Sequence, residues 1–492
     1  MSKKQDFYEL LGLARTATAE EIRQAYHDAA RRLHPDKNLS PGETEIFLNI
    51  QEAYETLSNP KKRTRYNETL PPEVVPEKTL DLKITYGRKN LLSIEEPQLA
   101  YAILELSAPA NVTAPPAPSL NLCLALDCST SMQGANLDVV KATAIQIMRK
   151  LKPQDVFSVV AFSDRAEVVI PATRSTDLAK QEARIHKLDA SGGTEIFSGL
   201  QMAYTEILHN QAHAQINHII LLTDGRTYGD EAKCLDLAQQ AAHRSVGISG
   251  LGIGSEWNDA FLDDLAARTG GTSMYVPRPQ DIQRILLDKF NRLGRSYSEE
   301  TRLEFKTAPG VELRYIFRLL PDSGLLSFES PVAMGTVVLD TSLKVLMEFV
   351  VQPEAVKKQS VTLLDGKIAT TLSNRSASAH PIPVHMHCPV SQETSIEPPP
   401  AEIMDALSRL KLYRLQEQAR LEVSAGNFSQ AAEHLSRLAT HLLAHGERGL
   451  ARTALLEAEH IQQKKSFSQQ GGKEIKYGTR ALLTAGKRDE TK

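Results

Sequence analysis

Oxygen-bearing side chains follow an apolar run in the segment Leu120–Met132, which reads LNLCLALDCSTSM. Asp127, Ser129 and Ser131 alternate along the chain just after this run. The run itself is typical of a strand that is buried on both faces of a parallel sheet. Ligands of open α/β sheets bind just beyond the carboxyl ends of such strands. The pattern alone fits equally a serine-rich turn that caps a helix.

Two more oxygen-bearing side chains occupy later loops of the same region. Thr194 follows a Gly-Gly pair just before a predicted helix, and Asp224 follows the apolar strand predicted at 219–223. Glycines in such a loop let the backbone approach a ligand closely. Strands and helices alternate through residues 119–295, which predicts a doubly wound, mostly parallel sheet. We expect this sheet to bring five side chains together at one edge: Asp127, Ser129, Ser131, Thr194 and Asp224.

Hydroxyl and carboxylate oxygens are hard donors, and this set selects Mg²⁺ over zinc, with Mn²⁺ or Ca²⁺ as alternatives. In order, residue type and approximate spacing, the five side chains resemble the metal-ion-dependent adhesion site of von Willebrand factor type A domains. The resemblance implies that the serines and the threonine bind the metal directly and that the aspartates act partly through water. It also implies one coordination position left open for a carboxylate of a partner protein.

The first 70 residues resemble a second known module. Thr18 with Glu21 and Ser40 with Glu43 have capping-box spacing, and each pair precedes an amphipathic helical pattern. A further short helix with basic residues is predicted after Asn59. The order DFYELLGL, TAEEIRQAYHDAARRLHPDKN and FLNIQEAYETLSNPKKRTRYN closely resembles the J domain of DnaJ-type co-chaperones. This resemblance implies that a DnaK-type chaperone is contacted, and its ATP hydrolysis stimulated, by His34, Pro35 and Asp36.

Basic residues on the preceding helix agree with such a partner. Arg23, His27 and Arg31 recur every four residues, so they share one helix face. A basic face steers a protein toward an acidic partner surface, although a solvated charged face is the ordinary alternative. Members of this family often carry lysines on this helix, whereas this chain has His27 and Asp28, which lower the positive charge of the helix. We therefore expect the docking to be weak or pH-sensitive.

The whole chain of 492 residues is predicted to be multidomain, with α, α/β and β parts. A helical J domain should precede an α/β domain that is inserted into an antiparallel β-sandwich, and a helical segment should end the chain. The predicted ranges are 1–70 for the J domain, 71–78 for a linker, 79–118 for strands that contribute to the sandwich, 119–295 for the von Willebrand A-type domain, 296–392 for the rest of the sandwich, 393–400 for a second linker, 401–463 for a helical hairpin region and 464–492 for a polar tail.

Four local features within these ranges lead to separate expectations. Asp365-Gly366 is predicted to be a turn between strands. Gly426-Asn427 should join two helices that resemble a tetratricopeptide-like hairpin, which would pack on the sandwich or on a partner. In the tail, the segment GGKEIKYGTRALL should dock as a strand. His385 and His387 share a strand face, but no acidic residue lies near them in sequence, so a metal role is disfavoured.

Composition and charge exclude several classes of protein. The net charge of −3 argues against bulk electrostatic binding to nucleic acid or to an anionic membrane. No apolar run is long enough to span a bilayer, and the amino terminus lacks a signal-peptide pattern. The four cysteines are scattered, which indicates core residues of a reduced compartment rather than disulfides or zinc ligands. Cys128 should point away from the metal. We expect a cytoplasmic protein.

These features favour a non-enzymatic co-chaperone. The metal-dependent domain would hold a partner protein through an acidic side chain, and the J domain would recruit a DnaK-type chaperone to that partner. The alternative is a metal-dependent scaffold with a vestigial J domain. A hydrolase that uses the metal to activate water is disfavoured, because we find no G-x-S-x-G, H-E-x-x-H, P-loop or Cys/His pattern. The sequence leaves the identity of the partner open.

Overall fold

The computed structural model divides the chain into two compact units, Met1–Glu77 and Lys78–Lys492. The structure describes residues 7–11, 13, 17–33, 41–69, 80–109, 118–174, 177–212, 215–226, 229–372, 381–393 and 397–484. None of the described helices combines the length and the apolar character that a membrane crossing requires.

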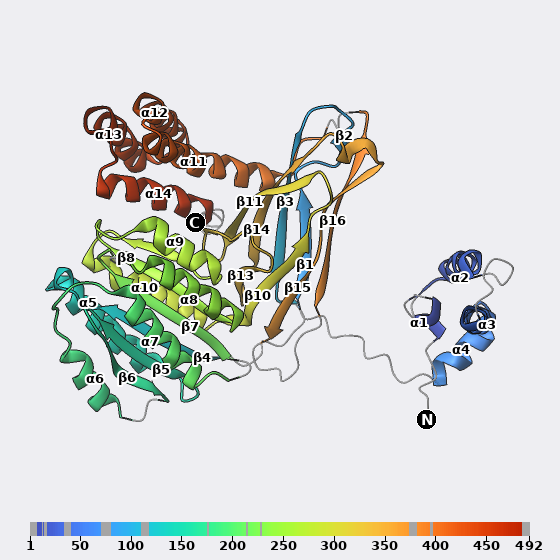
Figure 1. Cartoon of the computed structure of the whole chain (residues 1–492), viewed down its shortest axis with the longest axis horizontal. Helices are drawn as coiled ribbons and strands as arrows, with labels where there is room; N and C mark the ends of the chain where they lie inside the picture. The colour runs from blue at the N-terminus through green and yellow to red at the C-terminus, as the bar shows by residue number, and fades with distance from the viewer. Residues whose placement is uncertain are drawn as a thin grey trace. The chain divides into compact units, whose positions relative to one another are not determined.

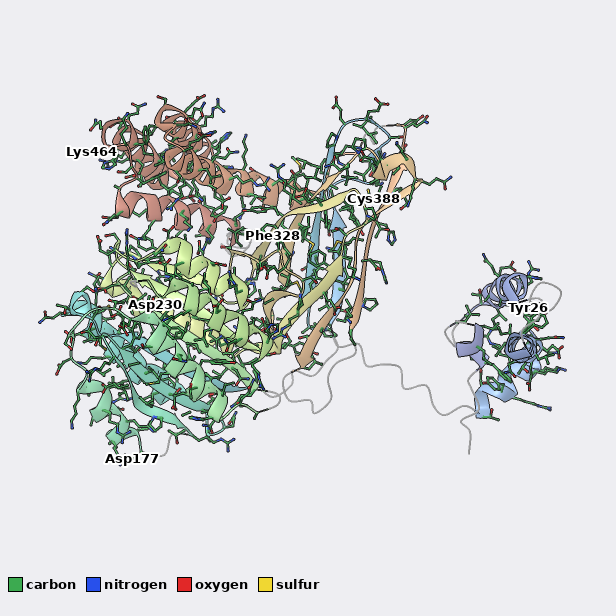
Figure 2. All side chains as sticks on the ribbon, in the orientation of Figure 1. Tyr26, Asp177, Asp230, Phe328, Cys388 and Lys464 are labelled. Carbon is green, nitrogen blue, oxygen red and sulfur yellow. The ribbon has the colours of Figure 1, made fainter. Side chains whose placement is uncertain are left out.

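The first unit is helical (Figure 1). Its described helices are α1 (Phe7–Leu11), α2 (Ala19–Leu33), α3 (Pro41–Leu57) and α4 (Pro60–Thr69). Helices α2 and α3 begin where the capping patterns predict, and α4 begins directly after Asn59, as predicted. Ile22 and Leu57 are at most 2% exposed in the small core. Tyr26, labelled in Figure 2, stacks on Tyr54 with the two ring centroids 4.1 Å apart. Apolar stripes at helical spacing therefore pack against one another, as their sequence indicates.

The second unit contains an α/β domain with its strands in the order β6-β5-β4-β7-β8-β9 (Figure 1). The strands are β4 (Ser119–Asp127), β5 (Val156–Phe162), β6 (Ala166–Thr173), β7 (Gln215–Thr223), β8 (Val246–Ile253) and β9 (Ser273–Val276). Only β6 runs antiparallel to its neighbour within this described sheet. Strand β4 is central, so β5 and β7 flank the residues that follow it. The fold is doubly wound, as the alternation of strands and helices predicts.

Helices cover both faces of this sheet. They are α5 (Ala135–Lys150), α6 (Leu178–His186), α7 (Ile196–His209), α8 (Glu231–His243), α9 (Asp259–Arg268) and α10 (Pro279–Leu293). Leu122 and Leu124 of β4 belong to a core cluster shared with α5, α6 and α10. Cys123 and Ala125 belong to a second cluster, shared with α7, α8 and α9. Successive residues of a strand point to opposite faces, so the uninterrupted apolar run of β4 serves both cores.

Two further sheets form a β-sandwich around the point where the α/β domain is inserted. In the described chain their orders are β1-β3-β14-β11-β12 and β13-β10-β15-β16-β2. The strands are β1 (Asp81–Tyr86), β2 (Leu91–Leu92), β3 (Gln98–Ser107), β10 (Ser296–Lys306), β11 (Val311–Leu320), β12 (Gly324–Leu325), β13 (Val332–Val338), β14 (Leu343–Val351), β15 (Ser360–Leu372) and β16 (Ile382–Ser391). Strand β3 pairs with β14, and β2 pairs with β16. Strands before the insertion thus pair with strands after it, which confirms the predicted arrangement.

The predicted turn at Asp365-Gly366 is wrong, because β15 runs straight through both residues. A Cβ atom at Gly366 would lie 2.2 Å from the carbonyl oxygen of Glu304 on strand β10. Glycine inside a strand often marks such a close approach of two backbones rather than a turn.

The carboxyl-terminal region contains more helix than the sequence analysis predicted. Its described helices are α11 (Ala401–Ser424), α12 (Phe428–Ala444), α13 (Arg448–Lys464) and α14 (Gln469–Thr484). Gly426-Asn427 does join two helices, and the predicted helical range 401–463 also contains most of a third helix, α13. The predicted docking of GGKEIKYGTRALL as a strand in a polar tail is wrong, since this segment lies in α14. Polar side chains of α14, including Lys476 and Arg480, are buried, so its inward face did not show an apolar pattern.

Candidate functional site

The loop after β4 presents its polar residues at the carboxyl edge of the sheet. Asp127 is fully buried, and its Oδ1 atom accepts a hydrogen bond from the backbone N–H of Ser129 at 2.8 Å. Met132, fully buried in the core, fixes the other end of the loop. Cys128 is buried in the same core cluster, and burial raises the pKa of its thiol to about 12. The thiol is therefore unreactive and belongs to the core.

The loop after β7 joins this arrangement through side chains. The Ser131 hydroxyl donates to Asp224 Oδ1 at 2.6 Å, and the Oγ atoms of Ser129 and Ser131 are 3.0 Å apart. The Thr223 hydroxyl donates to Asp127 Oδ2 at 2.6 Å, and Asn136 Nδ2 donates to Asp224 Oδ2 at 3.3 Å. Both carboxylates are thus held by neutral donors from the opposite loop.

The third loop carries Thr194 and is fixed by backbone contacts. The N–H of Ser191 donates to the Cys128 carbonyl at 2.8 Å, and the N–H of Thr130 donates to the Gly192 carbonyl at 3.1 Å. A Cβ atom at Gly225, next to Asp224, would lie 3.0 Å from Thr194 Oγ1. The structure therefore brings all five predicted side chains together at one edge of the sheet.

Asp164, in the turn between β5 and β6, supports the third loop. Its Oδ1 atom accepts a hydrogen bond from the N–H of Gly193 at 2.7 Å. Gly192 has φ +78°, and a Cβ atom there would lie 2.3 Å from Asp164 Oδ2. Only glycine fits this combination of a left-handed backbone and a close carboxylate. The Gly-Gly pair thus lets the loop close over Asp164 and sets the position of Thr194.

The electrostatics of the site suit a cation. Burial raises the pKa of Asp127 to about 6, and hydrogen bonds from Thr223 and Ser129 oppose the rise. Burial also raises the pKa of Asp224, opposed by hydrogen bonds from Ser131 and Asn136. A divalent cation among these oxygens would favour the ionised carboxylates. The two carboxylates and three hydroxyls fit the hard-oxygen preference of Mg²⁺, which keeps several waters when few protein ligands are available.

The described part of the chain contains no second cluster of side chains that could bind a metal ion. There, no group of three or more His, Cys, Asp or Glu side chains gathers to hold a metal ion. His385 Nδ1 lies 2.5 Å from Oδ1 of Asp365 on the neighbouring strand β15. This acidic residue is 20 positions away in the sequence and was not predicted to lie near His385. Both side chains are more than half exposed, and His387 lies opposite Thr362. Among the described residues, no third His, Cys, Asp or Glu side chain joins His385 and Asp365 to form a metal site.

Part of the proposed chaperone-binding face lies on α2. Arg23 and His27 are exposed, and Arg23 forms an ion pair with Glu20 at 2.7 Å. His34, Pro35 and Asp36 lie outside the described residues, as does the side chain of Arg31. Exposed ion pairs contribute little stability, so Arg23 stays available to a partner.

The basic residues of α4 differ in their surroundings. The Nε atom of Arg63 donates to the Tyr8 hydroxyl at 2.8 Å, and another guanidinium nitrogen donates to the Ala17 carbonyl at 2.6 Å. Its guanidinium carbon also lies 5.5 Å from the centroid of the Tyr8 ring. Arg63 therefore ties α4 to the start of the unit, whereas Lys61 and Lys62 are exposed.

Three residues that support the candidate site were not predicted from the sequence: Thr223, Asn136 and Asp164. Thr223 is the last residue of β7 and was treated as strand. Asn136 lies in the first turn of α5, and Asp164 lies in a tight turn. Polar residues at strand ends and first helical turns were the available signal, but such residues also cap helices in many proteins.

Comparisons with known proteins divide the chain in the same way. Residues 6–67 match the DnaJ domain, residues 121–287 match the von Willebrand factor type A domain, and residues 401–485 match the Sll0103-like, C-terminal alpha-helical domain. The chain is 26% identical over 330 residues to the uncharacterized protein sll0103 of Synechocystis sp., across 65% of this chain and 78% of that protein. It is 54% identical over 66 residues to the chaperone protein DnaJ of Carboxydothermus hydrogenoformans, across only 17% of that protein.

Solved structures share the fold of the second unit. A von Willebrand factor type A protein from Catenulispora acidiphila aligns with a TM-score of 0.65 and 16% identity, covering 82% of this chain and 96% of that chain. The ArnB paralog VWA2 from Sulfolobus acidocaldarius aligns with a TM-score of 0.51 and 15% identity, covering 82% of this chain and 99% of that chain. This chain therefore carries a DnaJ domain and, inserted in a β-sandwich, a von Willebrand factor type A domain.

Proposed function

We propose that the protein is a J-domain co-chaperone that holds a partner protein through a Mg²⁺-dependent von Willebrand factor type A domain. The observation that carries the proposal is the convergence of Asp127, Ser129, Ser131, Thr194 and Asp224 in a chain that also carries a DnaJ domain. One part would bind the partner, and the other would bring a DnaK-type chaperone to it.

The J domain would act through His34, Pro35 and Asp36, with Arg23, His27 and Arg31 on the adjoining helix. Exposed basic side chains raise the rate of encounter with an acidic surface and orient the partner. The proposed partner is a DnaK-type chaperone whose ATP hydrolysis this contact stimulates.

The metal centre would bind rather than catalyse. Hydroxyls of Ser129, Ser131 and Thr194 supply neutral oxygens, and the two aspartates supply charge. A bound divalent cation would offer a remaining position to a carboxylate from a partner, with Mg²⁺ preferred and Mn²⁺ or Ca²⁺ as alternatives. The described residues around the centre hold one another by hydrogen bonds. We propose that the protein is not an enzyme and that it works in the cytoplasm.

Stimulation of ATP hydrolysis tests the first half of the proposal. The full chain, added to a DnaK-type chaperone, should raise the rate of ATP turnover, and His34→Gln should abolish the rise. His209→Gln, an exposed histidine in the other unit, is the matched control and should behave as the wild type. Equal stimulation by wild type and His34→Gln would remove the chaperone role. A metal-dependent scaffold with a vestigial J domain would then remain.

Metal-dependent capture tests the second half. The wild-type chain should bind Mg²⁺ in a calorimetric titration and should retain partner proteins in Mg²⁺ but release them in EDTA. Asp127→Ala should lose both properties, whereas Asp405→Ala, an exposed aspartate on α11, should keep them. Retention of the same proteins by Asp127→Ala in EDTA would refute a metal-dependent contact.

A further inference from the structure

Helix α14 lies beside the α/β domain (Figure 1). It buries cationic side chains against this domain. Lys476 Nζ donates to Asp259 Oδ2 at 2.6 Å and lies 2.7 Å from Asp263 Oδ2. The Arg480 guanidinium donates to both carboxylate oxygens of Asp263, at 2.8 and 2.7 Å. These lysine and arginine residues are at most 7% exposed. Paired buried charges of this kind define one docked position of the helix, because moving it would leave charges unpaired.

Lys473 makes a different contact from its neighbours on α14. It is 5% exposed, and its Nζ atom donates to the backbone carbonyls of Ser255 and Trp257, at 2.5 and 2.6 Å. Burial lowers the pKa of this ammonium group to about 8. A buried cation whose described acceptors are carbonyls is costly for stability. The contact does, however, fix the position of the loop that contains both carbonyls.

Trp257 reports on this loop. It is the only tryptophan of the chain and is 1% exposed. Lys473 Nζ lies 4.8 Å from the centroid of the Trp257 rings, and the Tyr477 ring lies 5.7 Å away. A Cβ atom at Gly252 would lie 2.0 Å from the Trp257 indole, so the indole rests directly on strand β8. Undocking of α14 would therefore expose this indole to water.

The same loop is held from the metal side. Arg226 lies two residues after Asp224, and its Nε atom donates to the Glu256 carbonyl at 2.9 Å. Three consecutive carbonyls are thus bound from two directions: those of Ser255 and Trp257 by α14, and that of Glu256 by the metal loop.

A second connection leads toward Thr194. Asn258 Nδ2 donates to Oε1 of Glu231, the first residue of α8, at 2.7 Å. The neighbouring Asp230 accepts a hydrogen bond from the N–H of Phe197 at 2.8 Å, in the first turn of the helix that follows Thr194. The loop beneath α14 therefore contacts the segment after Asp224 directly and is linked to the segment after Thr194 through Asp230 and Glu231.

We propose that Lys473 is a positioning residue for the metal centre, so that docking of α14 and binding of the metal strengthen each other through the Ser255–Asn258 loop. This inference rests on the proposed metal-dependent function. Coupling between two sites is reciprocal, so a change at Lys473 must alter metal affinity, and metal must stabilise the docked helix.

Metal titration of the full chain provides the first test. Mg²⁺ affinity is measured by calorimetry for wild type, Lys473→Met, Arg226→Gln and the double variant. Each single change should raise the Kd for Mg²⁺ by about five-fold or more. Because both changes act through one loop, the Kd of the double variant for Mg²⁺ should not exceed that of the single variant with the higher Kd. Lys473→Arg should restore part of the affinity, and Lys464→Met, an exposed lysine labelled in Figure 2, should have no effect.

Fluorescence and hydrogen exchange provide a readout independent of affinity. Lys473→Met should shift the Trp257 emission to longer wavelength, and Mg²⁺ should slow amide exchange in residues 469–484 of wild type but not of Asp127→Ala. Wild-type Mg²⁺ affinity in both Lys473→Met and Arg226→Gln, or Kd increases that multiply in the double variant, would overturn the coupling and leave the metal site intact. Absence of Mg²⁺ binding to the wild type would instead overturn the metal site and the coupling with it.

Discussion

Replacing Thr223 by valine removes one hydroxyl from the candidate metal site and preserves the shape of the side chain. Thr223 is fully buried, and its Oγ1 atom donates to Asp127 Oδ2 at 2.6 Å and accepts from the N–H of Gly225 at 3.2 Å. Both partners lose this contact in Thr223→Val, and a buried valine offers no replacement.

The expected loss follows from these two bonds. A hydrogen bond to an ionised group contributes about 1.5–3 kcal/mol and a neutral one about 1 kcal/mol. At pH 8 Asp127 is ionised, because its pKa lies at about 6. We therefore expect Thr223→Val to lower the free energy of unfolding by roughly 2–4 kcal/mol in EDTA at this pH.

Urea unfolding followed by Trp257 fluorescence measures this loss, since the indole lies in the same α/β domain. Thr143→Val is the matched control: Thr143 is 1% exposed, but its hydroxyl donates to a helix carbonyl, that of Val139, at 2.7 Å. That carbonyl keeps its helical partner, so we expect a change of less than about 1 kcal/mol. Equal losses in the two variants would refute a special role for the bond to Asp127.

Three further variants test other parts of the structure. Burial raises the pKa of Glu300 to about 7, above its value in the unfolded chain. The wild type therefore loses stability as the pH rises from about 4.5 to about 7. In urea unfolding, Glu300→Gln should be more stable than the wild type by about 3 kcal/mol at pH 8 and equally stable at pH 4.5. Gly192→Ala should strain the loop by about 1–2 kcal/mol and displace Thr194, and unchanged Mg²⁺ affinity in calorimetry would contradict this. Asp263→Asn should cost about 3–5 kcal/mol, because buried Arg480 loses its paired carboxylate and buried Lys476 loses one of its two. Proteolysis within residues 465–484 that is no faster than in wild type would contradict this.

The three loops that carry the candidate metal ligands could be predicted to lie together because their signals in the sequence are local. The apolar run of β4 and the residues that follow it lie within one short segment. Thr194 and Asp224 occupy loops that any doubly wound sheet places near β4. The supporting contacts of Asp164 and Thr223 could not be found in this way. They depend on the distance between side chains far apart in sequence, such as the 96 positions that separate Thr223 from Asp127.

Helix α14 was missed for a different physical reason. Periodicity identifies a buried helix face when that face is apolar. The inward face of α14 contains Lys473, Lys476 and Arg480, whose acceptors include carboxylates 217 positions earlier. A lysine buried against a distant aspartate is indistinguishable, in the sequence, from a lysine in water. Gly471 and Gly472 also lowered the helical signal, although α14 continues through both residues.

The same contrast explains why α14 suits a regulatory contact better than an apolar helix would. An apolar face tolerates small shifts, because hydrophobic burial is non-directional. Lys473 instead binds two carbonyls of one loop, and Arg480 binds both oxygens of one carboxylate. Such contacts hold only in one register, so a small movement of the helix breaks several of them together. A partner or a metal that favours one position of the Ser255–Asn258 loop would therefore change the docking of α14 as a whole.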